Sequence, residues 1–412
     1  MVVDVDICGL KVGDNHPVRL MGVLNLSHES FYKGSVVRED SLIDAASVML
    51  EEGANVLDIG GRSTWPLAEP ISKEIERERL LPAIDALAGN VDAVLSVDTV
   101  FADIADQCLD RGADLVNDVS GFTIDENMVD VVADHACPAV VMASRKVPGD
   151  VLGMDAVMDS LEAIIELCEG KGIDTDRLIL DPAIGKWVPE KDPIYDFETF
   201  DRFERLQTFG KPVLAALSRK SFIGEVLNKP AAERLYGSLA ATAIAVHKGA
   251  HIIRTHDVAA TTDAVRIAEA IRGRIPCQKA GERQVRMLEI TDPDDSVKVM
   301  KSLDVTSTGA QVMKNKSVMF NLLVSNITTT EALIIKQEIL ARGGDACLER
   351  NAVSHETENT DLVVMGTLLQ LKKLVAKLQG QARNLPQIAA MMDTVLDEYN
   401  DVKYRYSSWK FD

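Results

Sequence analysis

The sequence predicts an α/β fold, namely a TIM (β/α)8 barrel followed by a smaller α+β domain. From Arg19 onward, eight short runs rich in Val, Ile and Leu alternate with longer stretches whose apolar residues recur at helical spacing. A Gly-Ala step precedes the second, fourth and eighth runs, in EEGANV, DRGADL and HKGAHI, which indicates one repeated structural unit. At 412 residues the chain has room for a barrel of about 250 residues and a second domain.

The eight apolar runs predict parallel strands that are buried on both faces. Continuous rather than alternating hydrophobicity is typical of a parallel sheet covered by helices. Between the runs, stretches such as 41–54 and 101–113 predict helices, each with a Gly near its end, as helix C-caps prefer. The predicted strands are 19–25, 55–60, 93–98, 114–119, 137–142, 177–182, 212–217 and 250–256.

A second domain is predicted where the barrel rhythm stops. Pro276 and Gly281 indicate a linker over 274–283. We therefore expect the barrel to span 1–273 and an α+β domain of unknown role to span 284–412. In that domain the predicted strands are 284–290, 317–324 and 361–366, and the predicted helices are 330–344, 368–379 and 385–399.

Composition excludes several classes of protein. With 44 Lys and Arg against 64 Asp and Glu, the formal charge of -20 argues against nucleic acid as the main partner. The first residues lack the basic and apolar segments of a signal peptide, and no run of about 18 apolar residues predicts a membrane span, so we expect a cytoplasmic protein. Six scattered cysteines without CxxC spacing suggest neither a zinc site nor a disulfide framework.

Polar and charged residues gather where the predicted strands end. In barrels of this kind the active site lies at the carboxyl ends of the strands. A single polar residue there is often only a helix cap, but seven of the eight strand ends carry one. Such a set can hydrogen-bond a nitrogen-rich heterocycle and hold an anion. Its members are Asn25, Asp58, Asp98, Asn117, Asp118, Asp181, Ser218 to Ser221, Arg254, His256 and Asp257.

Seven short motifs coincide with these strand ends. They are MGVLNLSHESF (21–31), DIGGRSTWP (58–66), SVDT (96–99), NDVSG (117–121), DPAIG (181–185), SRKSFIG (218–224) and RTHDV (254–258). In order and spacing, the set resembles the dihydropteroate synthase family over residues 15–273. One such motif is a weak signal, whereas seven in order are specific.

The resemblance implies a reaction and a set of roles. It implies condensation of a 7,8-dihydropterin-6-ylmethyl pyrophosphate with an aromatic amine, release of pyrophosphate with Mg²⁺ as cofactor, and a homodimer. Lys220, Asp98 and Arg254 are the implied catalytic residues. The pterin would be held by Asp98, Asn117, Asp181 and Lys220, the pyrophosphate by Asn25, Thr64, Arg254 and His256, and the metal by Asn25, while Ser221, Glu29 and Arg145 would border the amine pocket.

The first two loops depart from the family pattern. Ser27, His28 and Glu29 stand where the family usually has Thr-Pro-Asp, and Glu29 can keep the acidic function. Arg62 and Trp65 stand where Glu and Arg are usual. The leaving-group site therefore loses a cation, and whether Arg62 replaces it is an open question.

The loop after the fifth predicted strand also differs. Ala143 replaces the family's usual His, and Ser144, Arg145 and Lys146 follow it. These cations can bind a second anionic group. The amine is therefore expected to be either para-aminobenzoate or a ribofuranosyl-aminobenzene phosphate, as used in making methanopterin.

Two alternatives stay open. One is a methyltransferase that moves a methyl group from a reduced pterin to a corrinoid protein, although the SRKS and RTHDV motifs fit an anionic leaving group better. A methyl-transfer assay with a corrinoid acceptor separates this alternative. The other is a non-catalytic pterin-binding protein, which would bind pterin without releasing pyrophosphate.

Overall fold

The computed structural model divides the chain into two compact units, one containing Met1–Ile275 and the other Pro276–Ser408. It describes residues 3–27, 41–62, 71–273, 277–281, 283–353, 356–399, 401 and 405–406. None of the helices in those ranges is long and apolar enough to cross a bilayer.

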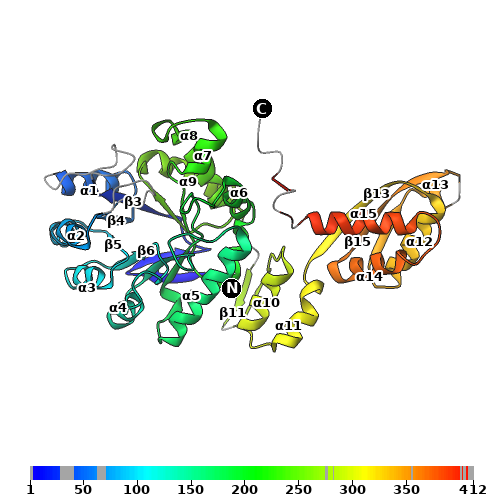
Figure 1. The fold of residues 1–412 in the computed structure, drawn as a ribbon, viewed down its shortest axis with the longest axis horizontal. Helices are drawn as coiled ribbons and strands as arrows, with labels where there is room; N and C mark the ends of the chain where they lie inside the picture. Colours follow the sequence, from blue (N-terminus) through cyan, green and yellow to red (C-terminus); the bar gives the residue numbers. More distant parts are fainter. Residues whose placement is uncertain are drawn as a thin grey trace. The chain divides into compact units, whose positions relative to one another are not determined.

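The first unit is an eight-stranded parallel barrel, so the predicted fold class is confirmed (Figure 1). Neighbouring strands pair in the order β8-β7-β6-β5-β4-β3-β10-β9, and a parallel bridge between Leu180 and Val213 joins the two ends of this order. All eight predicted strands are present. Their bounds are β3 (Arg19–Asn25), β4 (Val56–Gly60), β5 (Val94–Asp98), β6 (Leu115–Asp118), β7 (Ala139–Met142), β8 (Leu178–Asp181), β9 (Leu214–Ala216) and β10 (Ile252–Thr255).

Helices surround the strands and bury their outer faces in one continuous apolar core. The repeated Gly-Ala step ends three of the helices: Gly53, Gly112 and Gly249 adopt positive φ, and the Ala that follows each of them is buried. The helices are α1 (Leu42–Glu51), α2 (Lys73–Leu87), α3 (Ala102–Asp110), α4 (Met128–His135), α5 (Met154–Gly170), α6 (Pro193–Asp201), α7 (Ser221–Leu227), α8 (Leu235–His247) and α9 (Val258–Ile271).

A β-hairpin closes the amino-terminal end of the barrel. Strands β1 (Asp4–Ile7) and β2 (Leu10–Gly13) pair antiparallel, and Ile7 and Val12 bury their side chains among residues from the starts of the barrel strands. The sequence pattern did not predict this hairpin, because DVDI and LKVG are too short and too charged to stand out as strands. The opposite, carboxyl end of the barrel is therefore left for chemistry.

The second unit is an α+β module with its own apolar core. Its first element is a hairpin, β11 (Cys277–Ala280) and β12 (Arg283–Arg286), which begins inside the segment expected to be a linker; β12 is also shorter than the predicted strand 284–290. The sheet order is β13-β15-β14, of which β14 was not predicted. The remaining bounds are α10 (Pro293–Ser302), α11 (Ser307–Met313), β13 (Met319–Thr328), α12 (Thr329–Leu340), β14 (Asp345–Leu348), α13 (Arg350–Val353), β15 (Asn359–Thr367), α14 (Leu368–Leu378) and α15 (Leu385–Glu398).

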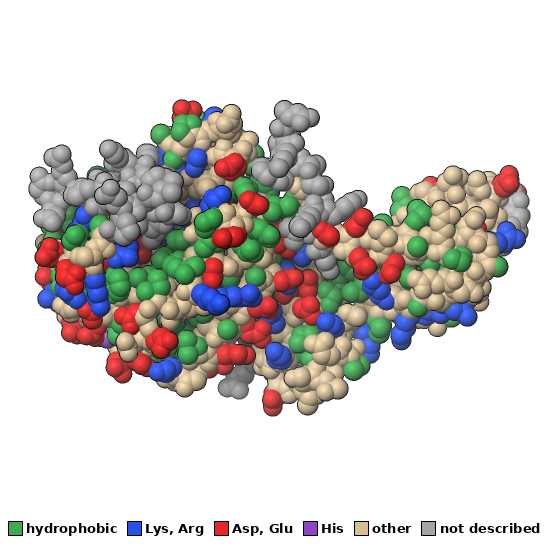
Figure 2. Space-filling view, viewed as in Figure 1, with side chains coloured by type: hydrophobic (Ala, Val, Ile, Leu, Met, Phe, Trp, Pro, Cys, Tyr) green, Lys and Arg blue, Asp and Glu red, His purple; other side chains and the backbone are tan. Residues whose placement is uncertain are grey.

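The negative charge of the chain belongs almost entirely to the barrel. Pro276–Ser408 contains 16 Lys and Arg against 17 Asp and Glu, so the second unit is close to neutral. Figure 2 shows acidic side chains spread over the visible face of the barrel helices. The chain's low pI is thus a property of the first unit.

Candidate active site

An arginine and two carboxylates form the centre of the candidate site. Arg254, in β10, donates from Nε to Asp58 Oδ2 at 2.6 Å and from Nη2 to Asp98 Oδ2 at 2.7 Å. Asp58 also accepts from Ser96 Oγ at 2.6 Å and from Asn117 Nδ2 at 3.1 Å. These bonds connect β4, β5, β6 and β10 across the inside of the barrel.

Burial gives this centre unusual ionisation. Asp58 is fully buried and Asp98 nearly so. Burial raises the pKa of Asp98 to about 7, although Arg254 opposes the shift. Burial alone would lower the pKa of Arg254, but the carboxylates of Asp58 and Asp98 outweigh it and raise the pKa. Arg254 therefore stays cationic, while Asp98 changes charge near neutral pH.

Lys220 and Asp181 form a second charged group. Lys220 is the N-cap residue of α7, and its Nζ lies 4.8 Å from the centroid of the Trp187 ring. Burial lowers the pKa of Lys220 to about 8, and Asp181 opposes the shift. Burial likewise raises the pKa of Asp181, and Lys220 opposes it. A cation and a carboxylate thus face the same interior with few competing water contacts.

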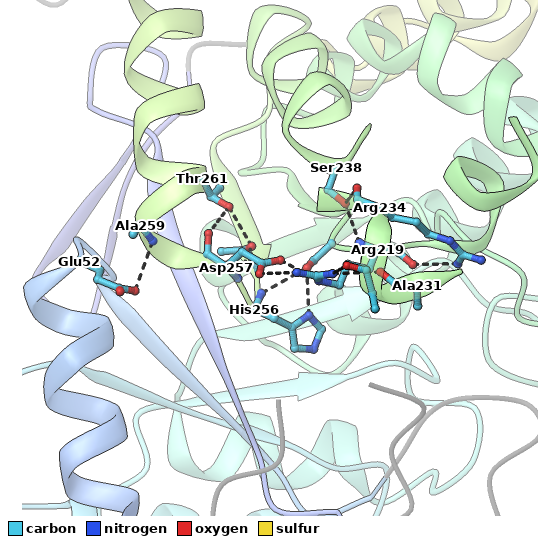
Figure 3. A network of polar contacts seen from close by, with 12 residues as sticks. Glu52, Arg219, Ala231, Arg234, Ser238, His256, Asp257, Ala259 and Thr261 are labelled. Atoms are coloured by element: carbon cyan, nitrogen blue, oxygen red, sulfur yellow. Dashed lines mark hydrogen bonds and ion pairs between the residues drawn. The ribbon is translucent and has the colours of Figure 1, made fainter. Parts of the chain in front are cut away.

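Two consecutive contacts tie the loop after β9 to the loop after β10 (Figure 3). Ser218 Oγ lies 3.0 Å from His256 Nδ1. Arg219 donates two hydrogen bonds to the Asp257 carboxylate, from Nε to Oδ2 at 3.0 Å and from Nη2 to Oδ1 at 2.7 Å. Since Lys220 follows this pair in the chain, these contacts set its place relative to the end of β10.

The Arg219 network extends into the next helix. Arg219 has a positive φ of 57°, and its Nη1 donates to the carbonyls of Ala231 and Ala232 at 3.0 and 2.8 Å. The backbone N–H of Arg219 donates to Ser238 Oγ at 2.8 Å, and Arg234 Nη1 donates to the backbone carbonyl of Arg219 at 3.2 Å (Figure 3). This strained backbone is held from several sides.

His256, Asn25 and Ser221 are three further polar residues at this end of the barrel. Burial, with Arg254 adding to it, lowers the pKa of His256 to about 3, so the imidazole is neutral at physiological pH. Asn25, at the end of β3, accepts the Ser27 N–H through Oδ1 at 2.9 Å. Ser221, the first residue of α7, accepts the Lys186 N–H at 3.1 Å. Each offers neutral hydrogen-bonding groups rather than charge.

Two sequence-predicted positions lie outside the described residues, and two others make contacts apart from this cluster. Thr64 and Glu29 lie outside the described residues. Arg145 is half exposed, and within the described residues its guanidinium has an ion-pair contact only with Asp159, at 3.8 Å. Arg62 donates to the buried Glu76 at 2.8 Å and lies over the Phe101 ring, so its cation already has a carboxylate partner.

The structure adds residues for which the sequence pattern predicts no role. Asp58 is predicted only as one of the polar strand ends, and Ser96 belongs to the SVDT motif without a predicted role. Lys191 and Asp196 are buried under the turn after β8. Nothing in the charged stretch around Lys191 distinguished it from a solvated loop, whereas Asp58 could have been found from its central place in an apolar strand.

Comparison with known proteins shows which enzyme family has this barrel and these motifs. A family model described as pterin binding enzyme matches residues 21–256. The dihydropteroate synthase of Synechocystis sp. is 36% identical over 263 residues, covering 61% of this chain and 89% of that protein. A probable bifunctional folylpolyglutamate synthase/dihydropteroate synthase of Halobacterium salinarum is 40% identical over 263 residues, covering 61% of this chain and 31% of that protein.

Solved structures are similar over the same part of the chain. A Coxiella burnetii dihydropteroate synthase in complex with pteroic acid has a TM-score of 0.57 and 36% identity, over 62% of this chain and 94% of that chain. A Yersinia pestis dihydropteroate synthase with a sulfonamide drug has a TM-score of 0.60 and 33% identity, over 66% of this chain and 99% of that chain. The chain therefore belongs to the pterin-binding enzyme family and, within it, to the dihydropteroate synthase group of transferases.

Proposed function

We propose that this enzyme condenses a 7,8-dihydropterin-6-ylmethyl pyrophosphate with an aromatic amine and releases pyrophosphate. The observation that carries the proposal is the charged centre at the carboxyl end of the barrel, where Arg254 contacts both Asp58 and Asp98 and Lys220 lies near Asp181. Carboxylates and amides suit the donor-rich edge of a pterin, and the cations suit the pyrophosphate.

The pterin is proposed to bind Asp98, Asn117, Asp181 and Lys220. The two carboxylates accept from ring N–H and amino groups, while the Asn117 amide is already oriented by Asp58. Lys220 donates to a ring oxygen or nitrogen. Because these groups are buried, their hydrogen bonds form in surroundings where they are stronger than in water.

The reaction needs charge stabilisation at two places. As the C–O bond to pyrophosphate breaks, positive charge grows on the pterin methylene and negative charge on the leaving group. Buried carboxylates stabilise the first, and Arg254 stabilises the second. Within the described residues, Nε and Nη2 of Arg254 have protein partners and Nη1 has none, which leaves donors for an anion.

Magnesium is proposed as the cofactor, with Asn25 as its protein ligand. Among the described residues, no group of three His, Cys, Asp or Glu side chains could hold a metal ion, so a dedicated protein cage is not part of the proposal. Mg²⁺ usually keeps several waters and binds through substrate phosphates and one or two protein oxygens. The Asn25 carbonyl oxygen fits that donor set. Bound there, the metal would neutralise charge on the leaving pyrophosphate.

A phosphorylated aromatic amine, such as the ribofuranosyl-aminobenzene phosphate, is proposed alongside para-aminobenzoate. Arg145 and Lys146 follow β7, and the exposed Arg145 guanidinium is held only by a long contact to Asp159 among the described residues. The Asp150 carboxylate already accepts the backbone N–H groups of Arg145 and Lys146, at 2.7 and 3.0 Å. Any second anion would therefore be recognised by the two side chains.

A homodimer is also proposed, and α8 supports it. Tyr236, Ala240 and Ile244 are spaced four residues apart on this largely apolar helix, and all three are exposed. An uncharged stripe on a chain of charge -20 allows two copies to approach without repulsion there. Cytoplasmic location stays an expectation from the sequence.

The test is an assay of pyrophosphate release. Purified enzyme with Mg²⁺ and the dihydropterin pyrophosphate receives para-aminobenzoate in one reaction and the phosphorylated ribosyl aminobenzene in another. Amine-dependent release that Lys220→Ala abolishes supports the proposal, and the preferred amine names the substrate. Pterin binding without release in either reaction contradicts it and favours the methyltransferase or non-catalytic alternatives.

A further inference from the structure

A lysine and an aspartate are buried beneath the turn that follows β8. The side chains of Lys191 and Asp196 are 1% and 3% exposed, and Lys191 Nζ lies 3.7 Å from Asp196 Oδ1. Lys191 is among the largest fully buried side chains of the described residues. Burying a charged pair costs free energy that a structural role alone rarely requires, so its contacts need explanation.

The pair holds both ends of one short turn. Lys191 Nζ donates to the carbonyl of Ala183 at 2.6 Å. Asp196 Oδ1 accepts the N–H of Gly185 at 2.9 Å. Ala183 has a φ of 60° and Gly185 a φ of 117°, both in the region that side-chain-bearing residues avoid. The two buried side chains therefore clamp a strained backbone.

This turn carries or supports the pterin and amine residues. Asp181 begins it, and its Oδ1 accepts the Ala183 N–H at 2.7 Å. Gly185 lies against the stem of Lys220, since a Cβ added there would come within 3.0 Å of Lys220 Cδ. The next residue, Lys186, donates to Ser221 Oγ. A shift of the turn would thus move Asp181, Lys220 and Ser221 together.

We propose that Lys191 and Asp196 are positioning residues that clamp the turn 183–185 and so place Asp181 and Lys220 for pterin binding. The inference rests on the proposed function, because pterin is the ligand that those two residues are proposed to hold. Neither Lys191 nor Asp196 needs to touch the substrate.

Two substitutions at Asp196 separate the clamp from the charge. Asp196→Asn keeps an oxygen that accepts the Gly185 N–H but removes the ion pair. Asp196→Leu removes the acceptor as well. With Asp196→Leu we expect the Kd for the pterin pyrophosphate and its KM to rise about tenfold or more, because displacements near 1 Å have effects of that size or larger. With Asp196→Asn both constants should stay close to those of the unsubstituted enzyme.

The matched control is Glu198→Leu on the same helix. Glu198 is also buried, accepts the Met154 N–H at 3.2 Å and lies 3.8 Å from Arg202, and none of these contacts touches the turn. We expect it to lower the melting temperature without changing the Kd for pterin. Where Asp196→Leu does not fold, Lys191→Met, which removes the Ala183 bond, takes its place.

The outcomes are distinguishable. If the unsubstituted enzyme does not bind the pterin pyrophosphate, the proposed function fails. If it binds, and Asp196→Leu or Lys191→Met lowers only the melting temperature while pterin Kd and KM per folded molecule stay unchanged, the pair is merely structural and the inference is overturned. The clamp is supported if Asp196→Leu raises the Kd for the pterin pyrophosphate and Asp196→Asn leaves it close to that of the unsubstituted enzyme.

Discussion

Arg254 Nη2 lies 2.7 Å from Asp98 Oδ2, although 156 residues separate the two in the chain. Their strands are not neighbours in the barrel, since β3 and β4 lie between β10 and β5. The contact therefore crosses the barrel interior at the end where the site is. It places one cation between the proposed pterin and pyrophosphate subsites and determines how that end of the barrel is ionised.

The first prediction concerns pH. Burial raises the pKa of Asp98 to about 7, and protonation removes its charge and turns one of its two acceptor oxygens into a donor, so pterin binding weakens as pH falls below that value. Lys220, whose pKa is about 8, donates as an ammonium ion only below that value. We expect a narrow bell in kcat/KM against pH, with its maximum between the two.

Substitutions assign the two limbs of the bell. In Asp98→Asn the acid limb should flatten, and in Lys220→Ala the alkaline limb should flatten, both at reduced activity. If the acid limb persists unchanged in Asp98→Asn, another group such as the substrate pyrophosphate is responsible for it.

The second prediction is that Arg254→Met destabilises the barrel in a pH-dependent way. The substitution leaves the buried Asp58 and Asp98 without their cation, which costs about 3 kcal/mol. Loss of Arg254 also raises the pKa of Asp98 further. Since a group with a raised folded-state pKa favours the folded state at low pH, the deficit should be larger at pH 8 than at pH 6.

Thermal unfolding at the two pH values measures this effect. Lys211→Met serves as the control, because Lys211 pairs with the exposed Asp176 at 2.9 Å, near the start of β9 rather than its end. The loss of stability caused by Lys211→Met should be small and equal at both pH values. An Arg254→Met deficit that does not change with pH would show that Asp98 is not the group that titrates.

The strands and most strand-end residues could be predicted because each depends on local pattern. A parallel strand buried on both faces appears as a continuous apolar run, and its carboxyl end is where a polar residue becomes conspicuous. Asp98, Asn117 and Arg254 were placed in this way, and the structure brings them together.

Long-range partners could not be predicted in the same way. The fully buried Lys191 has ordinary loop neighbours in sequence, and only the folded turn shows why it is buried. From its place in the sequence Arg62 is a candidate to replace the lost cation, but in the structure its guanidinium bonds to Glu76. The hairpin β1–β2 is not visible in the sequence pattern, because its apolar residues are buried by the amino-terminal ends of the barrel strands rather than by each other.

The third prediction concerns Gly185. An added Cβ at this position would come within 3.0 Å of Lys220 Cδ and 3.3 Å of its Nζ. Gly185→Ala should therefore displace Lys220 and raise the pterin KM about tenfold or more. Gly89→Ala is the matched control, because Gly89 also has a positive φ but no atom within 4 Å of the position that a Cβ would take.

Both substitutions should cost about 1 kcal/mol of stability from the positive φ alone. Steady-state kinetics and thermal unfolding on the two variants separate the effects. If Gly185→Ala and Gly89→Ala change KM equally, crowding of Lys220 is not the cause.

The fourth prediction is that the barrel works without the second unit. The matches to the Synechocystis and Clostridium beijerinckii dihydropteroate synthases cover 61% of this chain but 89% and 93% of those proteins. The family match ends at residue 256. The two units also have separate apolar cores, so each can fold on its own buried residues. A chain ending at residue 275 should keep its kcat, its pterin KM and its melting transition. If kcat falls while the melting transition is kept, the second unit contributes to the site or to the assembly that completes it, and comparing the molecular mass of the two chains in solution distinguishes these two explanations.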